Sequence, residues 1–333
     1  MNKCLCLVVV CLMGLVSLGY LSAQTVLIEN DFDSATATDI GPTFQFFGNA
    51  AGGVVGTGDP DTGSFTNTAA ITNTNGFNNT ATVDVLALAP TATGFELEVV
   101  IDSVTNAANL QSNGFFIGVV SGTNATLGGN MNGDAVNNAT ALFNNAPAAI
   151  GFRIGGAGIN PTFTFVEDPL DGGFGNAGQV NVNLPDPAVA PVLPPLADIE
   201  DGFTVTFSVD NANNYTLTTT GLGTDITGLT GTLDGAGGAT PGSTLFSAIQ
   251  NDLGISISAQ GAGVGVEVGS VTLTSIQLLG DVDLNGVVTF FDIPPFLAIL
   301  LDRSFQFEAD IDGDGDVDFF DIAPFIDILF GNP

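Results

Sequence analysis

The chain has 333 residues, of which 45% are hydrophobic and only 11% charged, and its formal net charge is −32. A chain with this much negative charge repels nucleic acids and anionic membranes. We therefore expect neither of them as a partner. There is no histidine, and the three cysteines lie within residues 4–11. These absences exclude Ser-His-Asp and Cys-His catalytic sites and zinc sites from the rest of the chain.

Residues 1–23 have the three parts of a secretory signal peptide. Lys3 precedes an apolar run from Leu5 to Leu18, and the small residues Ser22 and Ala23 follow. This order predicts cleavage near Ala23, which leaves a mature chain without cysteine. No later segment approaches 18 uninterrupted apolar residues, so we expect no membrane span. The predicted location is therefore extracytoplasmic, either secreted or on the cell surface.

Residues 24–279 predict one mainly β domain, an antiparallel β-sandwich of the jelly-roll type. Its clearest strand is 203–209, where Phe and Val alternate with Thr and Ser, and an Asp/Asn turn leads into a second strand at Tyr215 to form a hairpin. Pro185 to Pro195 reads as a surface loop. Further strands are expected at Val26–Asn30, Thr82–Leu88, Gly94–Asp102, Gly114–Val120, Ala149–Ile154, Val180–Leu184, Leu253–Ala259 and Val264–Leu278.

The first strand, VLIENDFD, and the last, VEVGSVTLTSIQL, are expected to pair and bring the ends of the domain together. In strand order and size the domain resembles concanavalin A-like lectin and glucanase jelly rolls. That resemblance implies carbohydrate binding or, as an alternative, a divergent glycoside hydrolase.

The sequence of this domain offers two kinds of candidate site. Glu96, Glu98 and Asp102 share one face of a predicted strand, and glycoside hydrolysis needs only two carboxylates. Their spacing is not the E-x-D-x-x-E of the glucanases and the chain has no Trp, so we expect a solvent-facing polar strand and no catalytic residue. Loops such as Gly58–Gly63 or Asp168–Gly175 could hold a calcium-dependent sugar site, although most such loops are turns.

A twelve-residue acidic pattern occurs twice near the C-terminus. The copies are DVDLNGVVTFFD and DIDGDGDVDFFD, which start 29 residues apart at Asp281 and Asp310. Oxygen-bearing residues at positions 1, 3, 5, 9 and 12 and Gly at position 6 are typical of EF-hand calcium loops. Gly286 and Gly315 are expected to take the positive-φ turn.

The pattern predicts two calcium ions, one in each loop, because calcium takes roughly six to eight oxygen ligands and a chain winding round it presents alternate residues. Val287 and Asp316, at position 7, would offer their backbone carbonyls. The expected ligands are Asp281, Asp283, Asn285, Val287, Thr289 and Asp292 in the first loop, and Asp310, Asp312, Asp314, Asp316, Asp318 and Asp321 in the second.

Each loop runs into a helix-periodic apolar segment, and no helix is expected before either loop. Position 12 carries Asp in place of the usual Glu. This duplicated loop and helix unit, residues 280–333, resembles the type I dockerin domain. The resemblance implies a calcium-folded module that binds a cohesin-type module of another protein, in extracellular polysaccharide binding or breakdown.

Both loops carry a Phe pair where classical dockerins have small hydroxyl residues. We expect Phe290 and Phe319 to pack inside the module and Phe291 and Phe320 to point outward as two pseudo-symmetric anchors for the partner. The leading hypothesis is thus a secreted, non-catalytic β-sandwich protein docked through a dockerin-like module. The alternatives are a structural or adhesive surface protein and a divergent glycoside hydrolase.

Overall fold

The chain divides into two compact units, Gln24–Gln277, called the body below, and Leu278–Pro333, called the C-terminal module. The predicted signal peptide and the proline-rich segment 185–195 lie outside the described residues. The computed structural model describes residues 25–33, 39–48, 56–67, 74–79, 83–110, 115–121, 148–155, 162–169, 180–184, 196–212, 214–223, 225–232, 246, 250–284, 288–312 and 315–330.

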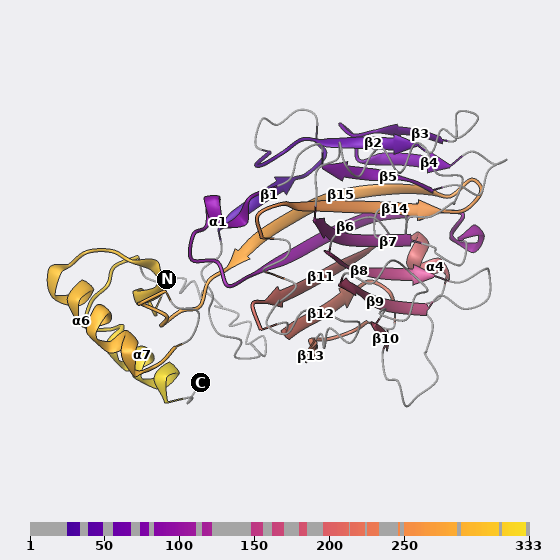
Figure 1. The fold of residues 1–333 in the computed structure, drawn as a ribbon. Helices are drawn as coiled ribbons and strands as arrows, with labels where there is room; N and C mark the ends of the chain where they lie inside the picture. The colour runs from indigo at the N-terminus through magenta and orange to yellow at the C-terminus, as the bar shows by residue number, and fades with distance from the viewer. Residues whose placement is uncertain are drawn as a thin grey trace, which may run out of the picture. The chain divides into compact units, whose positions relative to one another are not determined.

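The body contains two antiparallel sheets (Figure 1). The strand order in sheet A is β13-β12-β11-β6-β15-β4-β3, with β1 also paired to β15, and in sheet B it is β10-β9-β8-β7-β14-β5-β2. The bounds in sheet A are β1 Val26–Asn30, β3 Gly56–Asp59, β4 Ser64–Asn67, β6 Gly94–Thr105, β11 Phe203–Asp210, β12 Asn214–Thr220, β13 Leu229–Thr232 and β15 Gly265–Ile276. Those in sheet B are β2 Phe44–Gly48, β5 Thr74–Asn79, β7 Phe115–Ser121, β8 Ala148–Gly155, β9 Thr162–Pro169, β10 Val180–Leu184 and β14 Leu253–Gln260.

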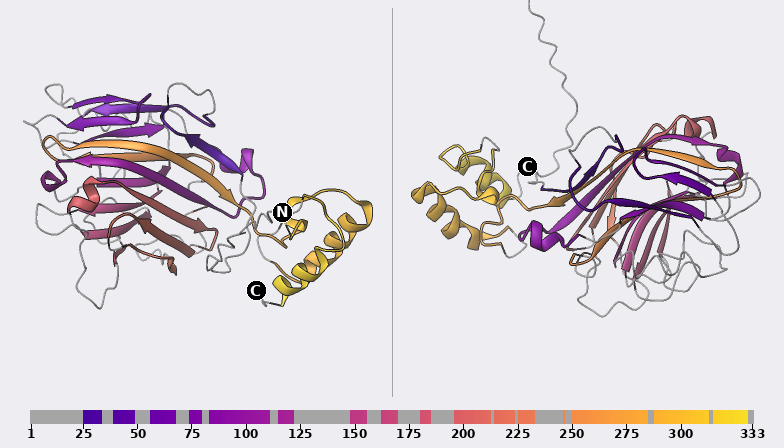
Figure 2. Two further views of the ribbon diagram at one scale, coloured as in Figure 1. Left: turned by 180° about the vertical axis from the view of Figure 1, so that it is seen from behind. Right: turned by 90° about the horizontal axis from the view of Figure 1, so that it is seen from above.

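The two sheets share one apolar core. Along β11 every second side chain is buried, as the period-2 pattern predicts. Phe203 of β11 meets Phe115 of β7 edge to face, with ring centroids 5.6 Å apart, and so joins sheet A to sheet B. The hairpin of β11 and β12 and the pairing of the first strand with the last are confirmed. The body is therefore a two-sheet antiparallel β structure, and Figure 2 shows it from two further sides.

One predicted strand is wrong. Among the described residues 83–88 only Val83 forms a bridge, to Leu253, and the short helix α1, Val85–Leu88, follows. The side chain of Asp84 accepts a hydrogen bond from the amide of Ala87 at 3.0 Å, so it caps a helical turn that apolar periodicity alone reads as a strand. Two further short elements of the body are the 3₁₀ helix η1, Ala107–Asn109, and the helix α4, Leu196–Glu200.

Sequence patterns also missed several strands, namely β2, β3, β4, β5, β9 and β13. The strands β3 and β4 form a hairpin across the predicted loop Gly58–Gly63. Its turn is closed by Asp59, whose carboxylate accepts a hydrogen bond from the amide of Asp61 at 3.0 Å. This segment is thus a turn, the plainer of the two interpretations.

The C-terminal module contains two α-helices, α6 Ile293–Asp302 and α7 Ile322–Leu329, and two 3₁₀ turns, η2 Phe290–Asp292 and η3 Phe307–Ala309. The prolines of α6 lie in its first turn, where a missing amide costs no hydrogen bond. Phe296 of α6 stacks on Phe325 of α7 with centroids 4.3 Å apart and planes 7° apart. These two rings form the centre of a small core with Leu279, Val282, Leu300, Ala309, Ile311 and Val317.

The buried face of α6 is narrower than its apolar spacing suggests. Leu297 and Leu301 of α6 are exposed, although both belong to the helix-periodic apolar segment after the first loop. A short 3₁₀ turn, η3, lies directly before the second loop, where the sequence predicts no helix. Within the part of the chain that the structure describes, no helix has the length and apolar character needed to cross a bilayer.

Candidate metal sites in the C-terminal module

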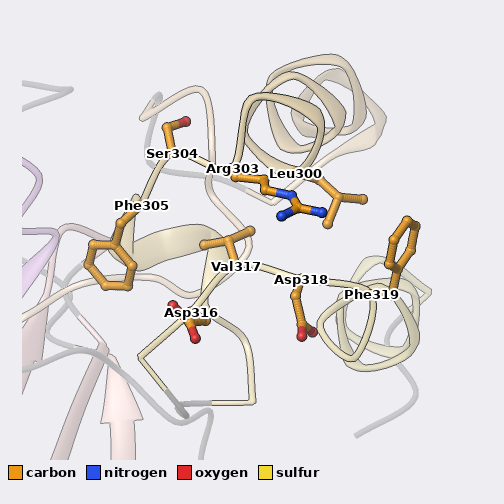
Figure 3. Close-up of a pocket in the computed structure, with 8 residues that line it drawn as sticks. All are labelled: Leu300, Arg303, Ser304, Phe305, Asp316, Val317, Asp318 and Phe319. Atoms are coloured by element: carbon orange, nitrogen blue, oxygen red, sulfur yellow. The ribbon is translucent and has the colours of Figure 1, made fainter.

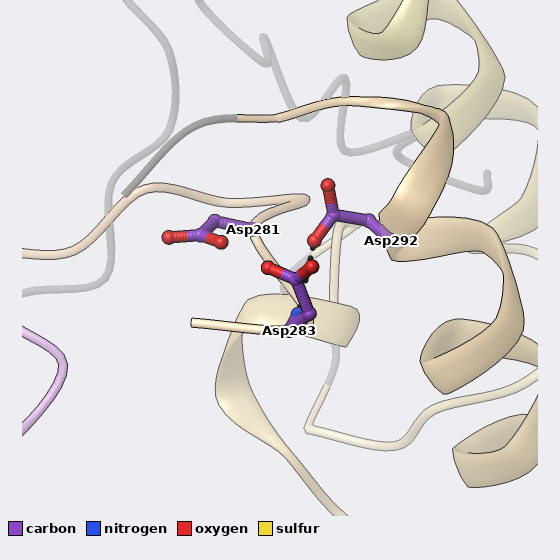
Figure 4. A group of neighbouring side chains, drawn as sticks. All are labelled: Asp281, Asp283 and Asp292. Atoms are coloured by element: carbon purple, nitrogen blue, oxygen red, sulfur yellow. Dashed lines mark hydrogen bonds between the residues drawn. The ribbon is translucent and has the colours of Figure 1, made fainter. Parts of the chain in front are cut away.

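Each acidic loop brings three carboxylates together. In the first loop these belong to Asp281, Asp283 and Asp292, each with an oxygen within 4.8 Å of the others (Figure 4). The second loop repeats the arrangement at the same three positions, 1, 3 and 12, with Asp310, Asp312 and Asp321. In both clusters the carboxylates at positions 1 and 12 are buried and the one at position 3 is exposed.

Such a cluster is costly without a cation. Two unit charges at 4.8 Å repel by about 3 kcal/mol at an effective dielectric constant of about 20. Three such pairs sum to about 9 kcal/mol, which exceeds the whole stability of a module of this size, about 3 to 8 kcal/mol. Arg303 is the only basic residue in 278–333, and it belongs to neither cluster. The oxygen-only donor set suits a hard divalent cation such as calcium and disfavours zinc.

The carboxylate at position 12 also closes its loop. In the first loop Asp292 Oδ1 accepts a hydrogen bond from the amide of Asp283 at 2.9 Å, and its Oδ2 accepts one from the amide of Thr289 at 2.7 Å. The two ends of the loop are thereby joined through one side chain that is fully buried. The short side chain of aspartate suits position 12, because its carboxylate has to bond the backbone amides of Asp283 and Thr289 close to it.

The second loop uses the same arrangement with one more backbone amide. Asp321 Oδ1 accepts from the amides of Ile311 at 2.6 Å and Asp312 at 3.1 Å, and its Oδ2 accepts from the amide of Asp318 at 2.7 Å. At the other end, the amide of Gly315 donates to Asp310 Oδ2 at 3.0 Å. Gly315 has φ +92°, the positive-φ turn expected at position 6.

The residues at position 9 have a capping role that the calcium pattern did not reveal. Thr289 Oγ1 accepts from the amide of Phe291 at 3.2 Å and forms a capping box with Asp292. Asp318 Oδ1 accepts from the amide of Phe320 at 2.7 Å in the second copy. The spacing of a Thr or Asp three residues before an Asp, at the start of an apolar helix, is the signal that predicts such a box.

The remaining predicted ligands are placed less closely. Asp316 and Asp318 are outside the second carboxylate cluster and line a neighbouring pocket. Asn285, Val287 and Asp314, like Gly286, lie outside the described residues. Their role in binding an ion stays a prediction.

All four phenylalanines of the loops are exposed. For Phe291 and Phe320 this agrees with the expectation, with 78% and 73% of their surface accessible. For Phe290 and Phe319 the expectation of inward packing is wrong, since 62% and 76% is accessible. The small core is centred instead on the stacked rings of the two helices.

The acids of the body are arranged as a polar strand surface. Glu96 is half-buried and Glu98 and Asp102 are exposed, all on the outward face of β6. Thr206 of the adjacent β11 donates to Glu98 Oε2 at 3.3 Å. Asp102 lies over Gly269 of β15, where a Cβ would come within 2.3 Å of its Oδ1. Hydroxyl and glycine positions of neighbouring strands thus accommodate this row of acids.

Comparison with known proteins gives no family assignment, because no family model and no curated protein matches the chain. Solved structures that align with it include the lectin of Bauhinia forficata in complex with GalNAc, at 9% identity and TM-score 0.43 over 76% of this chain and 98% of the lectin. A CBM2 module of the evolved Dit of Lactobacillus casei BL23 phage J-1 aligns at 10% identity and TM-score 0.42 over 77% and 98%. With TM-scores this low, neither the fold nor the ligands of these proteins are carried over to this chain.

Proposed function

We propose that residues 280–333 are a dockerin-like module that binds two calcium ions and attaches the β-sandwich body to a cohesin-type module of another protein. The observation that carries the proposal is the repeated cluster of three carboxylates, two of them buried, at identical positions of two loops. One divalent cation in each cluster would replace the repulsion among the acids by attraction.

The ions would act as structural groups. Asp281, Asp283 and Asp292 would hold one ion, and Asp310, Asp312 and Asp321 the other, because these carboxylates converge. When bound, calcium supplies positive charge beside the buried carboxylates of Asp292 and Asp321. The chain's own part is to present oxygen atoms and to hold the loops closed through the amide bonds of Asp292 and Asp321.

Calcium titration of the chain from residue 24 onward tests this proposal. We expect two bound ions by isothermal titration calorimetry, and one ion after either Asp292→Ala or Asp321→Ala. Asp327→Asn is the matched control, because Asp327 is an exposed acid of α7 outside both clusters. Two ions in all variants, or none in the parent chain, would refute the site.

The role of the body is the second part of the proposal. We infer that it is a secreted, non-catalytic module that binds polysaccharide, and this rests on the resemblance of the C-terminal segment to dockerins. A glycan array probed with the calcium-loaded chain is the test, since binding to a defined glycan class is expected. Release of reducing sugar from a polysaccharide panel would instead identify a hydrolase.

A further inference from the structure

The two loops carry the same carboxylate cluster but different amounts of negative charge. The first loop is acidic at positions 1, 3 and 12, whereas the second is acidic at positions 1, 3, 5, 7, 9 and 12. The additional acids are Asp314, Asp316 and Asp318, where the first loop has Asn285, Val287 and Thr289. The calcium affinity of such loops is tuned by the number of charged ligands and by the rigidity of the site. The difference in charge favours the second loop.

Two of the additional carboxylates lie beside the second cluster and not within it. Asp316 and Asp318 line a pocket between Arg303, at the end of α6, and the second loop (Figure 3). Their charge still adds to the negative potential at the cluster, because the Coulomb energy falls only as the inverse of distance. Arg303 is the only basic residue of the module and offsets one of these two charges at most.

The backbone of the two loops differs as well, at position 4. Leu284 of the first loop has φ 63°, in the left-handed region that side chains with a Cβ rarely adopt. Its side chain is 48% exposed, so packing offsets little of this strain. The second loop has Gly313 at the same position, and glycine takes a positive φ without a steric penalty. The first loop therefore closes at a conformational cost that the sequence of the second loop avoids.

The entrance of the first loop is bonded to the segment that leads into the second. The amide of Gly280 donates to the carbonyl oxygen of Glu308 at 2.8 Å, and Gln306 Nε2 donates to that of Val282 at 3.0 Å. Glu308 belongs to the turn η3 directly before the second loop, and Gln306 precedes that turn. A closed second loop therefore helps to position the residues with which the first loop begins.

We propose that the two calcium sites fill in order: the second loop binds its ion more tightly and closes first, and the weaker first loop is a calcium-dependent switch for the first half of the module. The inference deepens the proposed function, on which it rests. It assigns the regulation of the module to the loop with fewer acids and a strained backbone.

Closure of the first loop changes the surface that a partner meets. Asp292, which closes this loop, forms with Thr289 the capping box of η2, and α6 continues from that turn. Phe290 of the same turn packs edge to face on Phe330, which follows α7, with centroids 5.7 Å apart. Between the two calcium affinities these contacts are lost while the second loop stays closed. The first half of the docking surface is then complete only at the higher calcium concentration.

The experiment is hydrogen exchange with mass spectrometry on the chain from residue 24 onward, at a series of buffered free calcium concentrations. Peptides covering 283–292 and 312–321 report the two loops separately. We expect the peptide of the second loop to gain protection at a free calcium concentration about tenfold or more below that needed by the peptide of the first loop.

Two substitutions that copy the second loop into the first should narrow this gap. Leu284→Gly removes the left-handed strain and should lower the calcium midpoint of the first loop about fivefold. Thr289→Asp adds a carboxylate and should lower that midpoint too; it keeps the cap, since Asp318 makes the equivalent bond to the amide of Phe320. Leu284→Ala is the matched control. It removes the same side chain but keeps the Cβ that disfavours a positive φ, so the midpoint should stay at its parental value.

Three results would overturn the inference. These are coincident midpoints for the two loop peptides, protection of the first loop at the lower calcium concentration, and a first-loop midpoint that neither Leu284→Gly nor Thr289→Asp lowers. Calcium uptake measured by calorimetry on the same samples separates the two proposals. Two bound ions with coincident midpoints reject only the order of filling, whereas absent calcium uptake rejects the calcium-binding module itself.

Discussion

At a calcium concentration just sufficient to fold the parent C-terminal module, called low calcium below, replacing Phe296 by alanine should unfold that module while leaving the body folded. Phe296 is 2% exposed and stacks on Phe325 across the two helices. Truncating a buried Phe costs about 3 to 5 kcal/mol, and the lost ring pair adds about 0.5 to 1.5 kcal/mol. This sum is comparable with the whole stability expected of so small a unit, about 3 to 8 kcal/mol.

Calcium should reverse the effect by mass action. An ion at 100 times its dissociation constant stabilises the folded form by about 2.7 kcal/mol per site, so two sites offset most of the loss. Hydrogen exchange with mass spectrometry on the chain from residue 24 onward is the assay. At low calcium, peptides covering α6 and α7 should lose protection in Phe296→Ala, and raising calcium should restore it.

The control for this experiment is Phe291→Ala, because Phe291 is a highly exposed ring in the turn before the same helix. It should leave protection of both helices unchanged. The reasoning is refuted if Phe296→Ala keeps parental protection at low calcium, since the stack would then not hold the helices together. It is equally refuted if saturating calcium fails to restore protection, since metal binding and folding would then be uncoupled.

Three further predictions concern the loops and the body. Asp321→Ala should destabilise the module more than Asp292→Ala, because Asp321 accepts hydrogen bonds from three backbone amides and Asp292 from two. The expected difference is about one charged hydrogen bond, or about 1.5 to 3 kcal/mol. Comparing hydrogen exchange of α7 with that of α6 measures it, and equal losses of protection would contradict the prediction. A chelator should leave hydrogen-exchange protection of β11 and β15 unchanged, since their core is apolar, and lost protection there would indicate a metal site in the body. Burial raises the pKa of Tyr215 above 10.0. The contribution of Tyr215 to folding stability is therefore complete below its pKa in the unfolded chain and is lost as pH rises through its pKa in the folded chain. Ultraviolet titration of tyrosinate should give a higher midpoint in the folded chain than in denaturant, and equal midpoints would count against burial.

The sequence by itself determined the elements that depend on short-range pattern. Alternating apolar residues predicted β11 and its hairpin, because a strand with one buried face has period 2. The spacing of the acids and Gly315 predicted two loops and a positive-φ turn. The apolar spacing after each loop predicted the helices α6 and α7.

Only the tertiary structure decided which side chains meet and which stay exposed. Strands β2, β3 and β5 are rich in Gly, Asn and Thr or lack clear alternation, so only pairing with neighbours reveals them. Periodicity gives a helix an apolar face but not the area that its partner covers. The core of the module is centred on the stacked Phe296 and Phe325, whereas Phe290 and Phe319 stay exposed. The pocket at Arg303 joins the end of α6 to the second loop, thirteen residues on, and such a meeting follows from packing between helices rather than from local pattern.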